Sequence, residues 1–257
     1  MRARATILGS GTSTGVPTLG CSCAVCTSTD ARDQRLRPSL WLSYGGREVV
    51  IDTTPDFRTQ ALRAGIPALD AVLYTHSHAD HIMGLDDIRP FNFGRPEPLP
   101  VYGNAATIAD LRRVFRYAFE AGGQAGTSMP RIATHVLSES VELFGVRFEP
   151  VLALHGTLEV LGFRFGSCAY VTDFSEIPPP SLEQLRGLDV LILDALRRRP
   201  HPTHSNLENS LRLVERLAPR RAWFTHIAHE LSHAATEAAL PAHVRLAWDG
   251  LQVEAKF

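Results

Sequence analysis

The sequence contains no long apolar run. No stretch approaches the ~18 apolar residues of a membrane-spanning helix, so we expect no membrane partner. Met1 leads directly into a short apolar strand and a glycine-rich turn, without the apolar core of a signal peptide. Repeats, low-complexity tracts and linkers are also missing, and 257 residues, 44% of them apolar, suffice for one sizeable core. We therefore expect a single cytoplasmic domain over residues 1–257.

Neither sign of charge dominates the chain. It has 26 basic and 27 acidic residues, a balance that gives no reason to expect a polyanion-binding surface. We also find no extended basic arm that could grip RNA. We therefore expect a small-molecule partner and no nucleic acid.

Cysteine is scarce, and its placement is uneven. Three of the four cysteines, Cys21, Cys23 and Cys26, crowd into six residues. Thiols this close cannot form a disulfide framework among themselves, and without an export signal they are typical of a metal site in a reducing compartment. Cys168 stands alone in an apolar strand, where we interpret it as a small buried side chain.

Short apolar strands alternate with helical segments along the chain. The expected strands are residues 40–44, 48–52, 71–75, 146–154, 161–166, 168–171, 189–194, 221–225, 244–247 and 251–255. The expected helices cover 57–64, a segment capped by Asn104, and a segment that runs from a Ser205–Glu208 capping box to about Leu217. Strands followed by helices, twice over, predict an α/β fold of two packed sheets with helices outside, a four-layer αββα sandwich.

Four candidate metal ligands lie within six residues: His76, His78, Asp80 and His81. They directly follow an apolar strand that ends at Tyr74. Imidazole nitrogens and carboxylates suit zinc, manganese or iron. So many titratable groups at the end of a buried strand are costly without a cation to neutralise them. A histidine-rich polar loop is the alternative, and the spacing disfavours it.

This H-x-H-x-D-H pattern after an apolar strand resembles the signature of the metallo-β-lactamase superfamily. The resemblance implies an αββα sandwich with a binuclear metal site at one edge. It also implies three later ligands at strand ends, here His155, Asp173 and His226. By resemblance, one metal is held by His76, His78 and His155, and the other by Asp80, His81 and His226, with Asp173 bridging both.

Two further motifs resemble the PhnP family of cyclic phosphodiesterases within that superfamily. They are the glycine-rich segment 9–17 with the cysteines that follow it, and Thr225-His226-Ile227-Ala228-His229. In that family, three cysteines of the N-terminal loop and a distal histidine hold a structural zinc. The resemblance assigns this role to a loop at about residues 9–30, with the ligands Cys21, Cys23, Cys26 and His229. Such a set suits tetrahedral zinc, because thiolates favour zinc over manganese.

The same resemblance implies a catalytic histidine in a loop just before a helix. His204 occupies that place, immediately before the expected capping box, and His201 is its local competitor. Asp80 is expected to be catalytic as well as a ligand. Asp52 ends a strand at the same edge, where we expect it to hydrogen-bond a ligand histidine.

Together these features predict a metal-dependent phosphodiesterase for a small, cyclic phosphodiester. Two divalent cations of manganese, zinc or iron, about 3.5–4 Å apart, would share a water and lower its pKa to roughly 7. The resulting bridging hydroxide would attack phosphorus, and His204 would protonate the leaving alkoxide. The resemblance also implies a homodimer.

Several alternatives stay open on the sequence. Lactonases, thioesterases, β-lactamases and PqqB-like proteins share the superfamily, and Pro55-Asp56-Phe57-Arg58 resembles the PqqB relatives. The cysteine-rich loop and His204 favour phosphodiester chemistry over these. An alternative of another class is a metal-binding protein that has lost catalysis, which a full set of ligands disfavours.

Overall fold

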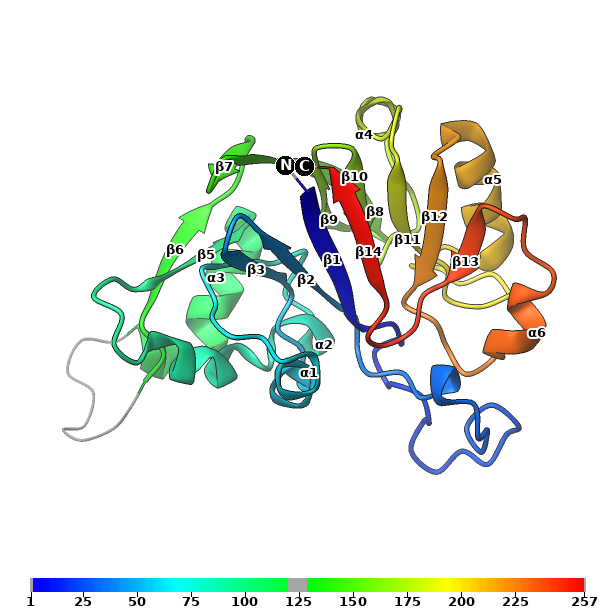
Figure 1. The fold of residues 1–257 in the computed structure, drawn as a ribbon, viewed down its shortest axis with the longest axis horizontal. Helices are drawn as coiled ribbons and strands as arrows, with labels where there is room; N and C mark the ends of the chain where they lie inside the picture. Colours follow the sequence, from blue (N-terminus) through cyan, green and yellow to red (C-terminus); the bar gives the residue numbers. More distant parts are fainter. Residues whose placement is uncertain (1, 120–128, 257) are drawn as a thin grey trace.

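The computed structural model describes residues 2–119 and 129–256. Within these ranges, no helix has both the length and the apolar character needed to cross a lipid bilayer. The described chain forms two seven-stranded sheets that pack face to face, with helices on the two outer sides (Figure 1). The four-layer αββα sandwich predicted from the sequence is therefore confirmed.

The first sheet has the strand order β14-β1-β2-β3-β4-β5-β6. Its strands are β1 (Arg2–Gly9), β2 (Ser39–Tyr44), β3 (Arg47–Ile51), β4 (Ala71–Leu73), β5 (Leu99–Gly103), β6 (Ile132–Val136) and β14 (Gln252–Lys256). Neighbours from β14 to β3 are antiparallel, and neighbours from β3 to β6 are parallel. Gly45 and Gly46 join β2 to β3 with φ values of 57° and 75°, which a tight hairpin turn requires.

The second sheet has the order β13-β12-β11-β10-β9-β8-β7. Its strands are β7 (Val141–Leu143), β8 (Val146–His155), β9 (Leu158–Phe165), β10 (Cys168–Val171), β11 (Val190–Asp194), β12 (Arg221–Thr225) and β13 (Val244–Leu246). Neighbours from β7 to β10 are antiparallel, and neighbours from β10 to β13 are parallel. Each sheet thus carries a parallel half, whose strand ends hold the site described below.

Helices follow the strands that they cover. On the first sheet lie α1 (Phe57–Ala64), α2 (Ala79–Ile82), η2 (Leu85–Asn92), α3 (Ala105–Val114) and η3 (Arg116–Ala118), and on the second lie α4 (Pro179–Gln184), α5 (Leu207–Leu217) and α6 (His233–Glu237). Gly65 ends α1 at φ 68°, and the Asn104 side chain accepts the N–H of Thr107 to cap α3, both as predicted. A further short helix, η1 (Ala31–Asp33), belongs to the loop between β1 and β2.

Three apolar clusters hold the layers together. One lies between the sheets, and the other two lie between a sheet and its helices. Strand β11 shows why the central strands are apolar throughout: Val190 and Ile192 face the other sheet, while Leu191 and Leu193 face the helices. Both faces of a parallel strand are covered here, so no polar side is needed.

Two local expectations were wrong. The N-cap of α5 is Asn206, whose side chain accepts the N–H of Asn209, while the Ser205 hydroxyl contacts that of Ser210 instead of capping. Asn and Ser are nearly equivalent caps, so the sequence does not separate them. In β8, the alternation of Val146, Phe148, Leu152 and Leu154 with outward positions predicts that Leu152 is buried. It is 37% exposed, because the strand runs beyond the inter-sheet core.

Candidate metal centres

Five strands of the two parallel halves end at one edge of the sandwich. The carboxyl ends of parallel strands meet on the same side of a sheet, so residues that directly follow them gather there. The side chains placed in this way are Asp52 after β3, Thr75 and His76 after β4, Asp173 after β10, Asp194 at the end of β11 and His226 after β12. His155, at the end of β8, joins the same edge.

Three of these strand-end residues adopt left-handed backbone conformations. Asp52, Asp173 and His226 have φ values of 64°, 57° and 57°. Aspartate and histidine tolerate this region better than most residues, yet it still costs about 1–3 kcal/mol each. The turn they make redirects the chain at the strand end, and the packed sheets supply the stability that offsets it.

A first group of histidines lies at this edge. The rings of His76 and His78 are 4.6 Å apart between centroids, and those of His78 and His155 are 5.1 Å apart. One nitrogen from each of the three lies within 4.8 Å of the others. The arrangement can hold one metal ion.

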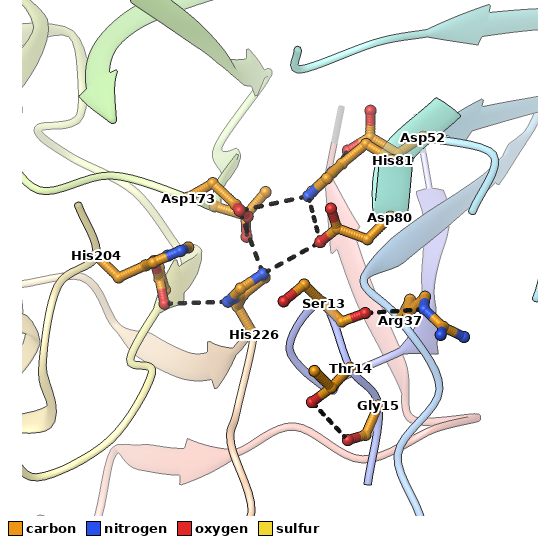
Figure 2. A network of polar contacts seen from close by, with 12 residues as sticks. Ser13, Thr14, Gly15, Arg37, Asp52, Asp80, His81, Asp173, His204 and His226 are labelled. Atoms are coloured by element: carbon orange, nitrogen blue, oxygen red, sulfur yellow. Dashed lines mark hydrogen bonds and ion pairs between the residues drawn. The ribbon is translucent and has the colours of Figure 1, made fainter. Parts of the chain in front are cut away.

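A second group lies beside the first, with Asp173 between them. Its Oδ2 atom is 3.2 Å from Nε2 of His226 and 3.4 Å from Nε2 of His81. The same oxygen is 4.0 Å from Nε2 of His76 in the first group. Asp80 completes the second group, with Oδ2 3.3 Å from Nε2 of His81 (Figure 2). Asp173 is therefore placed to contact ions in both groups.

The polar atoms at the centre of this cluster fit divalent metal ions. Nε2 of His76, His81 and His226 and Oδ2 of Asp80 are buried and have no hydrogen-bond partner among the described residues. Buried polar atoms without partners are rare in folded proteins, because each costs about 1–3 kcal/mol. A cation would satisfy all four at once, and imidazole with carboxylate is a suitable donor set for zinc, manganese or iron.

Neighbouring groups fix which nitrogen of each histidine faces the cluster. His81 donates its Nδ1–H to Oδ2 of Asp52 at 2.8 Å, and the N–H and hydroxyl of Thr75 also donate to that carboxylate. His155 donates its Nδ1–H to the carbonyl of Thr203 at 2.7 Å. These bonds leave the Nε2 atoms free as ligands, which is how metal-binding histidines are commonly oriented. Asp52 makes the contact predicted for it.

The electrostatics of the cluster call for positive charge. Burial alone would raise the pKa of Asp173, but His226 and His81 hold it well below its ordinary value. Burial would lower the pKa of His226, yet Asp173 and Asp80 raise it to about 10. Burial would likewise lower the pKa of His81, but the carboxylates of Asp173, Asp80 and Asp52 raise it well above its ordinary value. Without metal ions, protons on these imidazoles would have to balance the buried carboxylates.

His204 reaches the cluster, and His201 lies beyond it. The His204 ring stacks on that of His226, with centroids 4.7 Å apart and 16° between the planes. Its Nδ1–H donates to Oδ2 of Asp194 at 3.0 Å. Nδ1 of His201 accepts instead from the N–H and hydroxyl of Thr203. The other His204 nitrogen is left free to exchange a proton at the site.

Asp194 was missed as a functional residue by sequence reasoning. It is fully buried at the end of β11, with Oδ1 3.9 Å from Nδ1 of His226 and Oδ2 bonded to His204. A signal was present, because a carboxylate that ends a fully apolar strand repeats the pattern of Asp52 and Asp173. Its partners, however, come from two other segments of the chain.

A second candidate metal centre lies in the loop between β1 and β2. Three thiols surround Nδ1 of His229, at 3.2 Å for Cys21, 3.5 Å for Cys23 and 3.4 Å for Cys26. The backbone N–H of Cys26 is the main cause that lowers the pKa of the Cys23 thiol to about 6, which favours the thiolate. Three sulfurs and one imidazole at this spacing suit tetrahedral zinc.

Several other charged residues lie outside both centres. Arg197 and Arg199 pair with Glu230, and Asp56 pairs with Arg37. Arg58 lines an apolar pocket of about 660 Å³ between α1 and η2, which includes none of the candidate ligands.

A family model described as the beta-lactamase superfamily domain matches residues 47–227. Among solved structures, the chain is similar to a diphosphatase described as new and from the PhnP family. The TM-score is 0.94 and the identity 53%, covering 99% of this chain and 98% of that one.

Two curated proteins are also similar. An octanoyltransferase of Porphyromonas gingivalis is 36% identical over 252 residues, which cover 97% of this chain and 51% of that protein. Coenzyme PQQ synthesis protein B of Methylorubrum extorquens is 29% identical over 168 residues, which cover 59% of this chain and 50% of that protein. The chain thus spans about half the length of the curated relatives it matches.

Proposed function

The chain belongs to the beta-lactamase superfamily and, within it, to the PhnP family, and from this premise we propose that it is a binuclear metal-dependent hydrolase of a small, cyclic phosphodiester. The observation that carries the proposal is the convergence of unpartnered buried nitrogen and carboxylate atoms from both sheets, with His204 beside them. Both halves of the sandwich contribute, so the arrangement needs the complete fold.

The two groups of ligands would hold one ion each. His76, His78 and His155 form the first set, and Asp80, His81 and His226 form the second, with Asp173 shared. Bound divalent cations supply Lewis acidity, which lowers the pKa of water and offsets negative charge that grows on phosphoryl oxygens. The thiolates of Cys21, Cys23 and Cys26 with His229 would hold a structural zinc.

The chain itself supplies the proton that the leaving group needs. His204 holds a proton on Nδ1 for Asp194 and presents its other nitrogen to the site, where it protonates the departing alkoxide. Asp194 is a positioning residue, because its hydrogen bond to Nδ1 fixes the orientation of the His204 ring. Asp80, whose Oδ2 lies 3.3 Å from Nε2 of His81, would orient the attacking water through its carboxylate. The backbone turns at Asp52, Asp173 and His226 hold these groups in place before substrate arrives.

A diphosphate linkage is a second candidate for the bond that is broken. The similar PhnP-family structure with 53% identity is a diphosphatase, and its match covers nearly the whole of both chains. Hydrolysis of P–O–P and of P–O–C share the same needs, namely charge stabilisation at phosphorus and protonation of the leaving oxygen. A phosphate leaving group depends less on protonation than an alkoxide does, because the pKa of its conjugate acid is lower than that of an alcohol.

The other relatives point to different chemistry less directly. The name octanoyltransferase belongs to a protein of which this chain matches 51%, and the PQQ synthesis protein is matched over 50% of its length. Neither name is therefore carried over to this chain.

A substrate panel tests the proposal. Protein reconstituted with manganese or zinc is assayed with bis(p-nitrophenyl) phosphate, a 2′,3′-cyclic nucleotide, a dinucleoside diphosphate, nitrocefin and a homoserine lactone. We expect turnover of phosphodiesters, abolished by chelation. Turnover of only the diphosphate selects the second candidate, while turnover of only the lactam or lactone refutes both. Light scattering on the same sample tests the proposed homodimer.

A further inference from the structure

The glycine-rich segment near the N-terminus runs directly beside a candidate metal ligand. Ile227 donates its N–H to the carbonyl of Ser10 at 2.9 Å, and Thr12 donates its N–H to the carbonyl of Ile227 at 3.2 Å. Ile227 follows His226 in the chain, so the turn after Thr12 is held next to the metal cluster. Figure 2 shows the Ser13 side chain directed toward His226 and Asp80.

This turn is held rigidly. Gly15 donates its N–H to the carbonyl of Thr12 at 2.8 Å, which closes the turn, and its φ of 66° favours glycine. A Cβ atom at Gly11 would lie 2.9 Å from the carbonyl oxygen of Arg35, so the backbone there packs too closely for a side chain. The glycines of this segment therefore allow the backbone to pack closely against Arg35, while the opposite side of the turn faces the metal cluster.

An ion pair fixes the orientation of Ser13. Arg37 donates its Nε–H to the Ser13 carbonyl at 2.9 Å, and its Nη1 contacts both carboxylate oxygens of Asp56 at 3.0 and 3.1 Å. The Arg37 backbone N–H also donates to Asp56. With its carbonyl held toward Arg37, Ser13 turns its hydroxyl toward the cluster (Figure 2).

The turn presents hydrogen-bond donors without internal partners. Over the described ranges, neither the hydroxyl of Ser13 nor the backbone N–H groups of Ser13 and Thr14 make a hydrogen bond to protein, and both residues are exposed. The Thr14 hydroxyl differs, because it lies 3.2 Å from the Gly15 carbonyl. Backbone N–H groups together with a serine hydroxyl are the donors that proteins direct at phosphate oxygens.

We propose that the Ser13–Thr14 turn binds a non-bridging oxygen of the phosphoryl group of the substrate and thereby selects phosphoryl over acyl substrates. A tetrahedral phosphodiester has two non-bridging oxygens, one for the cations and one for the turn. A lactone or lactam has one carbonyl oxygen, which leaves none for Ser13. The inference rests on the proposed function, since it names the contact that makes the same site selective. Ser13 touches substrate, while Arg37 and Asp56 are positioning residues.

The test compares Ser13→Ala with Ser13→Thr, which keeps a hydroxyl, and with Ser140→Ala as the control, at an exposed serine just before β7. A hydrogen bond to a charged oxygen accounts for about 10- to 100-fold in affinity. We expect Ser13→Ala to raise KM for bis(p-nitrophenyl) phosphate by this factor, to weaken inhibition by inorganic phosphate equally, and to leave the metal content unchanged. Ser13→Thr should recover most of the loss, and Ser140→Ala should leave KM and phosphate inhibition unchanged. Unchanged KM and phosphate inhibition in Ser13→Ala would overturn the inference while leaving the proposed function intact.

Arg37→Ala probes the positioning role separately. We expect a rise in KM with kcat largely retained, and no further rise when Arg37→Ala is combined with Ser13→Ala, because both act through one contact. Additive effects would contradict this role. If the wild-type protein hydrolyses no phosphate ester or anhydride, the proposed function fails. Calorimetric binding of inorganic phosphate to metal-loaded wild type and Ser13→Ala then still decides whether the turn binds phosphate.

Discussion

At the residue scale, the proposed proton transfer depends on a hydrogen bond between His204 and Asp194. The bond is 3.0 Å long, and the carboxylate has no exposed surface. A buried carboxylate held on Nδ1 determines which nitrogen of the ring carries the proton toward substrate. His201, three residues earlier, lacks such a partner among the described side chains and instead accepts from Thr203.

The first prediction concerns this histidine. His204→Ala should lower kcat for an alkoxide-leaving phosphodiester by about 10²–10⁴-fold, the usual contribution of a general acid. The metal content, measured by plasma mass spectrometry, should not change, because His204 belongs to neither proposed ligand set. His201→Ala is the control and should retain kcat. Equal losses in both variants, or a loss of metal in His204→Ala, would contradict the assigned role.

A second prediction concerns Asp52, which fixes the ligand ring of His81 through a 2.8 Å hydrogen bond. Asp52→Asn replaces the anionic acceptor by a neutral amide and should weaken metal binding by about 10- to 100-fold. Titration with a competing chelator measures this affinity. Asp56→Asn, at a carboxylate that bonds Arg37 instead of a ligand, should bind the metals as the wild type does. Wild-type affinity in Asp52→Asn would refute the orienting role.

At the element scale, the loop between β1 and β2 is held by backbone bridges from Gly11 to Ile227 and from Val16 to Arg35, and by the side-chain contacts of its cysteines. It contains one short helix, η1, and projects beyond the ends of the sheets (Figure 1). Its cysteines meet His229, which lies three residues after His226 on the segment that leaves β12. The same loop includes the Ser13–Thr14 turn. Zinc held by the cysteines and His229 would therefore tie the loop that carries the proposed substrate contact to the segment that carries the candidate ligand His226.

A third prediction tests that link. Cys23→Ser should remove one zinc per chain and lower the Tm, where each 1 kcal/mol lost corresponds to about 2–4 °C for a domain of this size. It should also raise KM, because the turn loses its support. Cys168→Ala is the control, since this thiol is buried in β10 away from both centres and should leave the zinc content unchanged. Full zinc occupancy in Cys23→Ser would exclude the assigned site.

At the scale of the whole molecule, the two sheets are joined by the site as well as by the core. His76, His81 and Asp80 follow β4 of the first sheet, while Asp173 and His226 follow strands of the second. Ions bound between them would link the two halves of the sandwich at one edge. Removing the ions would leave buried carboxylates facing one another across that edge.

A fourth prediction follows for chelation. Dialysis against a strong chelator should abolish hydrolysis and lower the Tm, because ligands that bind only the folded state stabilise it by about 2.7 kcal/mol at 100 times their Kd. Added manganese or zinc should restore both activity and Tm. Differential scanning calorimetry with parallel assays measures the two quantities. An unchanged Tm after complete metal removal, verified by metal analysis, would show that no ions bridge the sheets.

Much of this architecture was readable from the sequence. Apolar segments such as residues 71–75 and 189–194 indicated buried strands, because polar–apolar alternation disappears when both faces of a strand are covered. The H-x-H-x-D-H spacing and the three crowded cysteines predicted local groups of candidate ligands, since those residues are neighbours in the chain. Local chemistry and periodicity determine such features before any tertiary contact forms.

Only the tertiary structure decided how distant residues meet. The pairing of Asp194 with His204 and the hydrogen bonds of Ser10 and Thr12 to Ile227 each depend on where separate elements come to lie. The choice of Asn206 over Ser205 as a cap depends on the same packing. The number of residues between two positions in the chain does not tell how far apart they lie at the edge of a sheet. The packing of two sheets brings these groups together, because their parallel strands all end on the same side.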